Sequence, residues 1–182
     1  GLLVWKERDA KMDEIYDALP FSGWISYVAK FTALIGVVAI VLLLGIVIGM
    51  LTQLSHGYTD FKIGLYIKEM LLLDLSYFAI LGALSMLVHS LVNHKYIGYF
   101  AFIVLLVSNV FGWRGLDVNS NMLIFGARPN SIYSDMNGFG PFAEGLTWFT
   151  IYWLLFAALI GLVTILYWVR GKSTGLAERT QI

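Results

Sequence analysis

The stretch FTALIGVVAIVLLLGIVIGML, residues 31–51, decides the fold of this chain, because it runs for 21 residues without a charged side chain. A helix rises by about 1.5 Å per residue, so a helical stretch of this length would be roughly 32 Å long. The hydrocarbon core of a bilayer is about 30 Å thick, and a helix that crosses it needs about 20 largely apolar residues. The stretch therefore predicts a membrane-spanning helix.

Three more stretches of the same kind follow, at residues 70–92, 96–113 and 148–169. Asp74 is the only charged residue inside any of these spans. A membrane β-barrel would instead show apolar and polar residues alternating in segments of about ten. We therefore expect an all-α fold, a polytopic transmembrane helical bundle of about four spans. Residues 1–182 form a single transmembrane domain, which we interpret as a fragment of a longer protein because Gly1 stands in place of an initiator methionine.

The composition agrees with a membrane protein and argues against several other classes. Hydrophobic residues make up 59% of the chain and charged residues 13%, against about 45–50% and about 25% in soluble domains. Twelve basic and twelve acidic residues give zero net charge, which argues against nucleic-acid binding. The sequence contains no cysteine, so disulfides, thiolate metal sites and cysteine nucleophiles are excluded. We expect no catalytic, metal or cofactor site and no enzymatic activity.

Lysine and arginine near the span ends predict the orientation, because these residues are enriched in cytoplasmic segments. With both chain ends in the cytoplasm, eight of them fall on the inner side and four on the outer side. Residues 114–147 then form an outer loop before the last span. Residues 93–95 form a very short inner turn, so the second and third spans are expected to be antiparallel neighbours.

The charged N-terminal segment predicts an amphipathic helix over residues 6–19. Four residues spaced as on one helix face carry this prediction: Met12, Ile15, Tyr16 and Leu19. Glu7 and Lys11 are placed as an i, i+4 ion pair, and Pro20 ends the helix. Such a helix either lies on the membrane surface or docks a partner subunit. A long helix is expected to run from Gly23 through the first span.

Small residues four apart mark two places where helices can approach closely. They are Gly45 and Gly49 in the first span and Ala157 and Gly161 in the last. Each pair serves packing within the chain or the seam of a permease dimer, or its glycines face lipid without a role. Asp74 lies near the outer end of its span, where it is either a solvated or paired interfacial carboxylate or part of a cavity or proton path.

The outer loop contains the most distinctive short motif of the chain, between Tyr133 and Glu144. Asp135, Asn137 and Gly138 stand where a calcium loop has ligands and its glycine, but Tyr133 replaces the first ligand. The pattern therefore favours a tight turn, since Asn-Gly tolerates positive φ. A gate over a translocation path is a further hypothesis for this loop.

The start of the chain resembles the permeases of ATP-binding-cassette exporters of the second class. The resemblance is carried by an acidic-basic start, a short helix ending in Leu-Pro, and a lysine that opens the next span. The matching residues are Glu7, Arg8, Met12, Glu14, Ile15, Leu19, Pro20 and Lys30. In that family the short helix is a cytoplasmic coupling helix, and a re-entrant element precedes the last span. The loop motif of residues 133–140 is similar to that of bacterial permeases fused to a zinc aminopeptidase domain.

This resemblance implies a bacterial inner-membrane permease that exports a substrate, with membrane lipid, a separate cassette ATPase and a second permease half as its partners. Any fused peptidase would lie outside this chain, which has no His-Glu-x-x-His motif. The alternative is a membrane anchor or assembly module that transports nothing and tethers a peptidase or another partner.

Overall fold

The computed structural model describes residues 2–12, 22–92, 94–118, 120–134 and 138–168, and most of these residues are helical, with no β-strand among them. The helices are α1 (Leu2–Asp9), α3 (Gly23–Ser55), α4 (Ile63–Tyr66), the π-helical segment η1 (Ile67–Asp74), α5 (Leu75–Leu91), α6 (Lys95–Gly115) and α7 (Phe142–Leu166). Four helices, with α4, η1 and α5 forming one of them, are long and apolar enough to cross a membrane. The predicted all-α bundle of four spans is confirmed.

The first, second and last of these helices begin before the predicted spans, in the residues that precede each apolar stretch. The first extends back to Gly23, as expected, and the second begins at Ile63 rather than at residue 70. The last begins at Phe142 rather than at residue 148, with Pro141 at its N-cap and Glu144 in its first turn. Proline and an acidic residue both favour a helix start, so the helix begins before the apolar stretch does.

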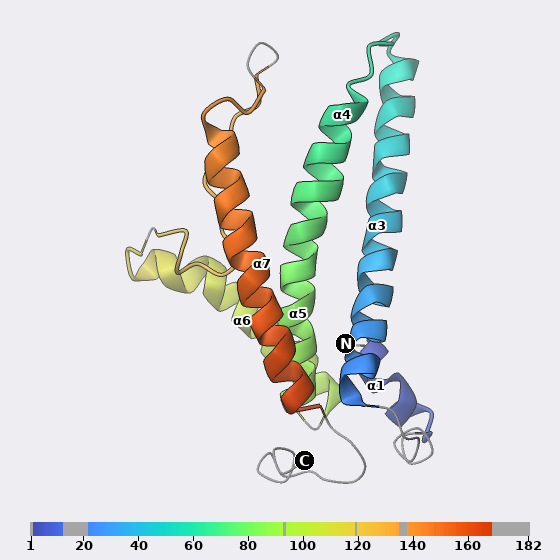
Figure 1. The fold of residues 1–182 in the computed structure, drawn as a ribbon, viewed down its shortest axis with the longest axis vertical. Helices are drawn as coiled ribbons and strands as arrows, with labels where there is room; N and C mark the ends of the chain where they lie inside the picture. The colour runs from blue at the N-terminus through green and yellow to red at the C-terminus, as the bar shows by residue number, and fades with distance from the viewer. Residues whose placement is uncertain (1, 13–21, 93, 119, 135–137, 169–182) are drawn as a thin grey trace.

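Helix α5 occupies the centre of the bundle, with α3 on one side and α7 on the other (Figure 1). Its buried residues Ile80 and Ala83 form the core together with Trp153, Ala157 and Ile160 of α7. Helix α1 lies at one end of the bundle, which we call the α1 end. The opposite end, where α3 and α4 are joined, is called the α4 end.

Helix α6 is steeply inclined to α5 and passes behind α7 (Figure 1). The prediction of antiparallel neighbours is therefore wrong for α5 and α6. The chain after α6 returns to the bundle, where Phe125 lies with its ring centroid 5.2 Å from that of Trp153. This returning loop therefore packs on α7.

Of the amphipathic helix predicted over residues 6–19, residues 13–19 lie outside the described residues. In the described part, helix α1 begins at Leu2 and ends at Asp9. Lys11 adopts a left-handed conformation with φ of 53°, and Met12 N donates to Glu7 O at 2.9 Å. This bond together with the left-handed residue is the Schellman arrangement that ends many helices. Glycine usually takes the left-handed position, so a lysine there gave no sign of a helix end.

Replacing Lys11 with glycine is expected to stabilise the end of α1. A non-glycine residue in the left-handed region costs about 1 kcal/mol, and glycine removes this cost. Hydrogen exchange of the α1 amides should slow several-fold. The control is Lys6→Gly, which places glycine inside the helix and should accelerate exchange. Faster exchange in Lys11→Gly would contradict the capping role.

Candidate functional site

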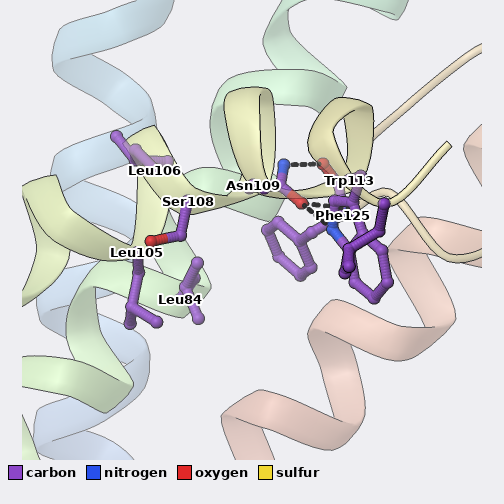
Figure 2. Close-up of a pocket in the computed structure, with 9 residues that line it drawn as sticks. Leu84, Leu105, Leu106, Ser108, Asn109, Trp113 and Phe125 are labelled. Atoms are coloured by element: carbon purple, nitrogen blue, oxygen red, sulfur yellow. Dashed lines mark hydrogen bonds between the residues drawn. The ribbon is translucent and has the colours of Figure 1, made fainter. Parts of the chain in front are cut away.

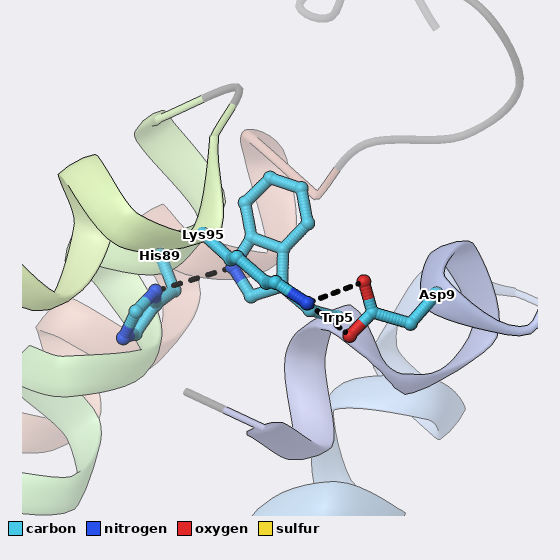
Figure 3. Close-up of polar contacts among 4 residues, drawn as sticks. All are labelled: Trp5, Asp9, His89 and Lys95. Carbon is cyan, nitrogen blue, oxygen red and sulfur yellow. Dashed lines mark hydrogen bonds and ion pairs between the residues drawn. The ribbon is translucent and has the colours of Figure 1, made fainter.

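The most specific polar contacts of the described chain hold α1 against the ends of three spans. Glu7 forms an ion pair with Lys30 of α3, and Asp9 forms one with Lys95 of α6, at 3.0 Å between Oδ2 and Nζ. Trp5 Nε1 donates to His89 Nδ1 of α5 at 3.2 Å. Figure 3 shows the Asp9 and Trp5 contacts together. We call these six residues the α1 docking site.

The two ion pairs of the α1 docking site differ in how far water screens them. The side chains of Lys30 and Glu7 are 12% and 26% exposed, whereas those of Lys95 and Asp9 are 32% and 45% exposed. Exposed ion pairs contribute little to stability because water and salt screen them. The Lys30–Glu7 pair is therefore the stronger attachment, and Lys30 also lies 5.1 Å from the ring centroid of Trp168.

His89 is the buried centre of the α1 docking site, with 2% of its surface exposed. Its Nδ1 accepts the Trp5 bond, so the proton of the neutral ring is on Nε2. Nε2 has no hydrogen-bond partner in the described part of the chain. The ring packs on Gly98 of α6, where an added Cβ would lie 2.3 Å from Nδ1. Gly98 is therefore required for α6 to approach this histidine.

The structure describes only part of the coupling helix that the sequence predicts. Glu7 lies in the α1 docking site and pairs with Lys30 rather than with Lys11. Arg8 lies on α1, and Met12 follows that helix with 55% of its surface exposed. The remaining members of the motif lie outside the described residues: Glu14, Ile15, Leu19 and Pro20.

Four residues of the α1 docking site were not identified from the sequence: Trp5, Asp9, His89 and Lys95. Trp5 and Asp9 are one helical turn apart, so they share a face of α1, which is a signal that the sequence does carry. Their partners are 84 and 86 residues away. No local pattern identifies pairs at such separations.

The loop that returns from α6 to the bundle is held by Asn109. Phe125 N donates to Asn109 Oδ1, and Asn109 Nδ2 donates to Phe125 O, both at 2.9 Å. Trp113 Nε1 also donates to Asn109 Oδ1, at 3.2 Å (Figure 2). Since hydrocarbon offers no hydrogen-bond partners, irregular backbone inside a bilayer must be satisfied by protein groups. The side-chain amide of Asn109 supplies these partners to Phe125.

A second anchor comes from α7, where Trp153 Nε1 donates to Ala127 O at 2.9 Å. Trp153 is 3% exposed and lies roughly 16 Å along α7 from Phe142, at about 1.5 Å per residue. The loop therefore enters the bundle well below the start of α7. This agrees with the re-entrant-like loop expected before the last span.

The π-helical segment η1 is held by Arg128 of the returning loop. Its Nη2 donates to Leu73 O at 2.6 Å, and its guanidinium carbon lies 5.6 Å from the ring centroid of Tyr77. Burial lowers the pKa of Arg128, whereas Asp74 and Tyr77 raise it, and the guanidinium stays charged. Asp74 itself is exposed at the last position of η1. π-helical turns are rare in proteins, but those that occur are often found at functional sites. The α4 end is therefore a second candidate site.

The small residues of the two marked spans have different surroundings. An added Cβ at Gly45 or Gly49 would meet nothing within 4 Å, so the interpretation that they pack within the chain is wrong for the described residues. Ala157 lies in the core cluster, and a Cβ on Gly161 would lie 2.8 Å from Tyr27 Oη. These two residues pack within the chain. For Gly45 and Gly49 two alternatives remain, a dimer seam and a lipid-facing position without a role.

The described ends of the loop motif, Ser134 and Gly138, lie next to each other, and the turn predicted between them stays a prediction. Ser134 and Gly138 exchange backbone hydrogen bonds of 2.9 and 2.7 Å, and Gly138 has φ of 59°. The Tyr133 ring contacts that of Phe139 at a centroid distance of 5.6 Å. Asp135 and Asn137 lie outside the described residues.

An apolar cavity of about 410 Å³ lies beside Asn109, lined by residues of α5, α6 and the returning loop (Figure 2). Leu84, Leu105 and Phe125 are among its lining residues, and the polar atoms of Asn109 are engaged with Phe125. The cavity therefore suits an apolar occupant.

Among the described residues, no group of three or more acidic or histidine side chains could hold a metal ion. Comparison with protein-family models, with curated proteins and with solved structures finds no match to this chain.

Proposed function

We propose that this chain is the permease part of an ATP-binding-cassette transporter, which couples ATP hydrolysis by a separate ATPase to export of a substrate. The observation that carries this proposal is the α1 docking site. It ties a short charged helix to α3 through Glu7 and to α6 through Asp9, at one end of a four-span bundle. The setting is a bacterial inner membrane, with the α1 end in the cytoplasm and two permease halves in the working unit.

The contacts suggest how movement would pass from the ATPase to the spans. In the family that the chain resembles, residues such as Glu14, Ile15 and Leu19 would contact the ATPase. These residues directly follow α1 in the sequence. A displacement of that segment would pull on α1, and the Glu7–Lys30 pair would pass the pull to α3 because it is well shielded.

Reversing either charge of the Glu7–Lys30 pair is expected to uncouple ATP hydrolysis from transport. In Glu7→Lys and in Lys30→Glu, like charges would face each other, at a cost of about 1 kcal/mol or more. The transport rate per ATP hydrolysed should fall about five-fold. The measurement is ATP-driven flux beside ATP hydrolysis, with the full-length protein and its ATPase in liposomes.

Two further variants make this experiment specific. The double variant Glu7→Lys with Lys30→Glu restores opposite charges and should recover most of the coupling. Lys6→Glu changes an exposed charge of the same helix and should leave coupling unchanged. If the double variant were as uncoupled as the single variants, the ion pair would have no role in transmission.

One observation favours a second candidate function, a membrane anchor that transports nothing. The two cavities described between the spans are lined almost wholly by apolar side chains, which suits a bundle without a polar path. An anchor would not bind a cassette ATPase. Co-purification of the full-length protein with such an ATPase, together with ATP-stimulated flux, separates the two functions.

A further inference from the structure

An apolar groove lies between α3, α5 and α7, near the α1 end of the bundle. Its volume is about 300 Å³, and its lining includes Phe31, Ala79, Leu154 and Ala157. This is about twice the roughly 150 Å³ of an engineered apolar cavity that binds benzene. The groove is therefore large enough for several carbons of a hydrocarbon chain.

The groove faces the surroundings of the bundle rather than its core. Val28 of α3 and Leu162 of α7 line it, and they are 45% and 59% exposed. Because α3 and α7 are both long and apolar enough to cross a membrane, the medium outside the groove is lipid. A lipid chain can enter it from the side without crossing protein.

Tyr27 gives the groove its only polar feature of note. Its ring is held by stacking on Phe31, with centroids 5.8 Å apart, and by an edge contact with Trp168 at 6.2 Å. Oη lies against Gly161, whose added Cβ would be 2.8 Å away. No hydrogen-bond partner of this hydroxyl is found among the described residues. An apolar site makes an unpaired hydroxyl costly, so a ligand that accepts its hydrogen bond would be favoured.

The position of Tyr27 decides which part of a lipid it would meet. It lies four residues after Gly23, the first residue of α3, which is about 6 Å along the helix. Aromatic residues with polar tips sit at the boundary of hydrocarbon and headgroups. The nearby Lys30 is already paired with Glu7, so the groove offers a neutral donor rather than a free cation.

We propose that this groove binds one glycerophospholipid, whose acyl chain lies between α3 and α7 while the Tyr27 hydroxyl donates to an ester carbonyl oxygen. The ligand is recognised by its ester and its chain, so the charge of its headgroup matters little. The site does not depend on whether the protein is a transporter.

The ester contact is tested with two lipids that differ only in their linkage. The full-length protein is placed in nanodiscs of diacyl or of dialkyl-ether phosphatidylcholine, and the lipid retained after transfer to detergent is counted by native mass spectrometry. One hydrogen bond within a bilayer is worth about three-fold in retention. Wild-type protein should retain the diacyl lipid about three-fold more than the ether lipid, and Tyr27→Phe should remove this preference. Equal retention of both lipids by the wild type would overturn the proposal.

The groove itself is tested with Gly161→Leu, whose side chain would fill the space beside Tyr27. Labelling by phosphatidylcholine with a diazirine on its acyl chain should map to residues 154–162 in the wild type and fall several-fold in this variant. Gly45→Leu is the matched control, because a side chain there meets open space, and its labelling should be unchanged. Even labelling along α7, or a disulfide between Val28→Cys in one copy and Leu162→Cys in another, would show that no lipid site exists there. If Gly161→Leu did not fold, the Tyr27→Phe comparison would decide alone, since it keeps the ring in place.

Discussion

Replacing Asn109 with leucine is expected to release the returning loop from α6. Leucine has nearly the same size but removes both the donor and the acceptor that serve Phe125. The N–H and C=O of Phe125 would then be unpaired in an apolar setting, at a cost of about 1–3 kcal/mol each. Hydrogen exchange in residues 120–128 should accelerate by roughly a hundred-fold, which corresponds to about 3 kcal/mol. The measurement is exchange followed by mass spectrometry on the protein in nanodiscs.

A neighbouring position provides the control for this variant. Val110 follows Asn109 on α6, is 50% exposed and is not among the residues that line the cavity, so Val110→Leu places the same side chain away from the loop. Exchange in the loop should stay at the wild-type rate in this variant. The anchoring role of Asn109 would be refuted if both variants gave the same exchange, because the loop would then be held mainly by Trp153 and Arg128.

The Gly98→Ala variant is expected to detach α1 from the bundle. The new Cβ would lie 2.3 Å from Nδ1 and 2.7 Å from Cε1 of His89, and this buried ring has little room to move. Either α6 or the imidazole must shift, at a cost of about 1–3 kcal/mol, and the bond from Trp5 is lost with it. Exchange of the α1 amides should rise at least ten-fold, and thermal stability of the full-length protein should fall.

Gly112→Ala is the matched control on the same helix, since its Cβ would meet nothing within 4 Å. Alanine is the better helix former by roughly 0.5–1 kcal/mol, so this control should be neutral or slightly stabilising. The two glycine variants are thus expected to differ in sign. Equal stability of both would mean that His89 moves freely, and the role assigned to Gly98 would be wrong.

The sequence predicted the spans well, because hydropathy over about 20 residues measures what a bilayer requires of a helix. It did not predict the inclination of α6, which is apolar on nearly all sides and so has no polar face to indicate its neighbours. It also did not predict η1. The stretch from Ile67 to Asp74 contains no proline or glycine that would mark the change from π-helical to α-helical turns.

The candidate site was predicted only where its residues are close in the sequence. Glu7 was identified through the charged motif, but its partner was expected at Lys11 and is Lys30 in the structure. The pairs Asp9–Lys95 and Trp5–His89 join residues more than 80 positions apart. They depend on how the helices pack at the α1 end, and a single sequence carries no direct signal of that packing.

The length of α3 has a consequence for where its ends lie in the membrane. Its 33 residues span about 50 Å at 1.5 Å per residue, against a hydrocarbon thickness of about 30 Å. Only residues 31–51 of α3 form an unbroken apolar stretch, and at about 1.5 Å per residue this stretch matches the hydrocarbon. The turns on either side of it carry polar residues such as Lys30 and Gln53, so they belong in the headgroup region. The excess length of α3 therefore holds its connection to α4 outside the hydrocarbon.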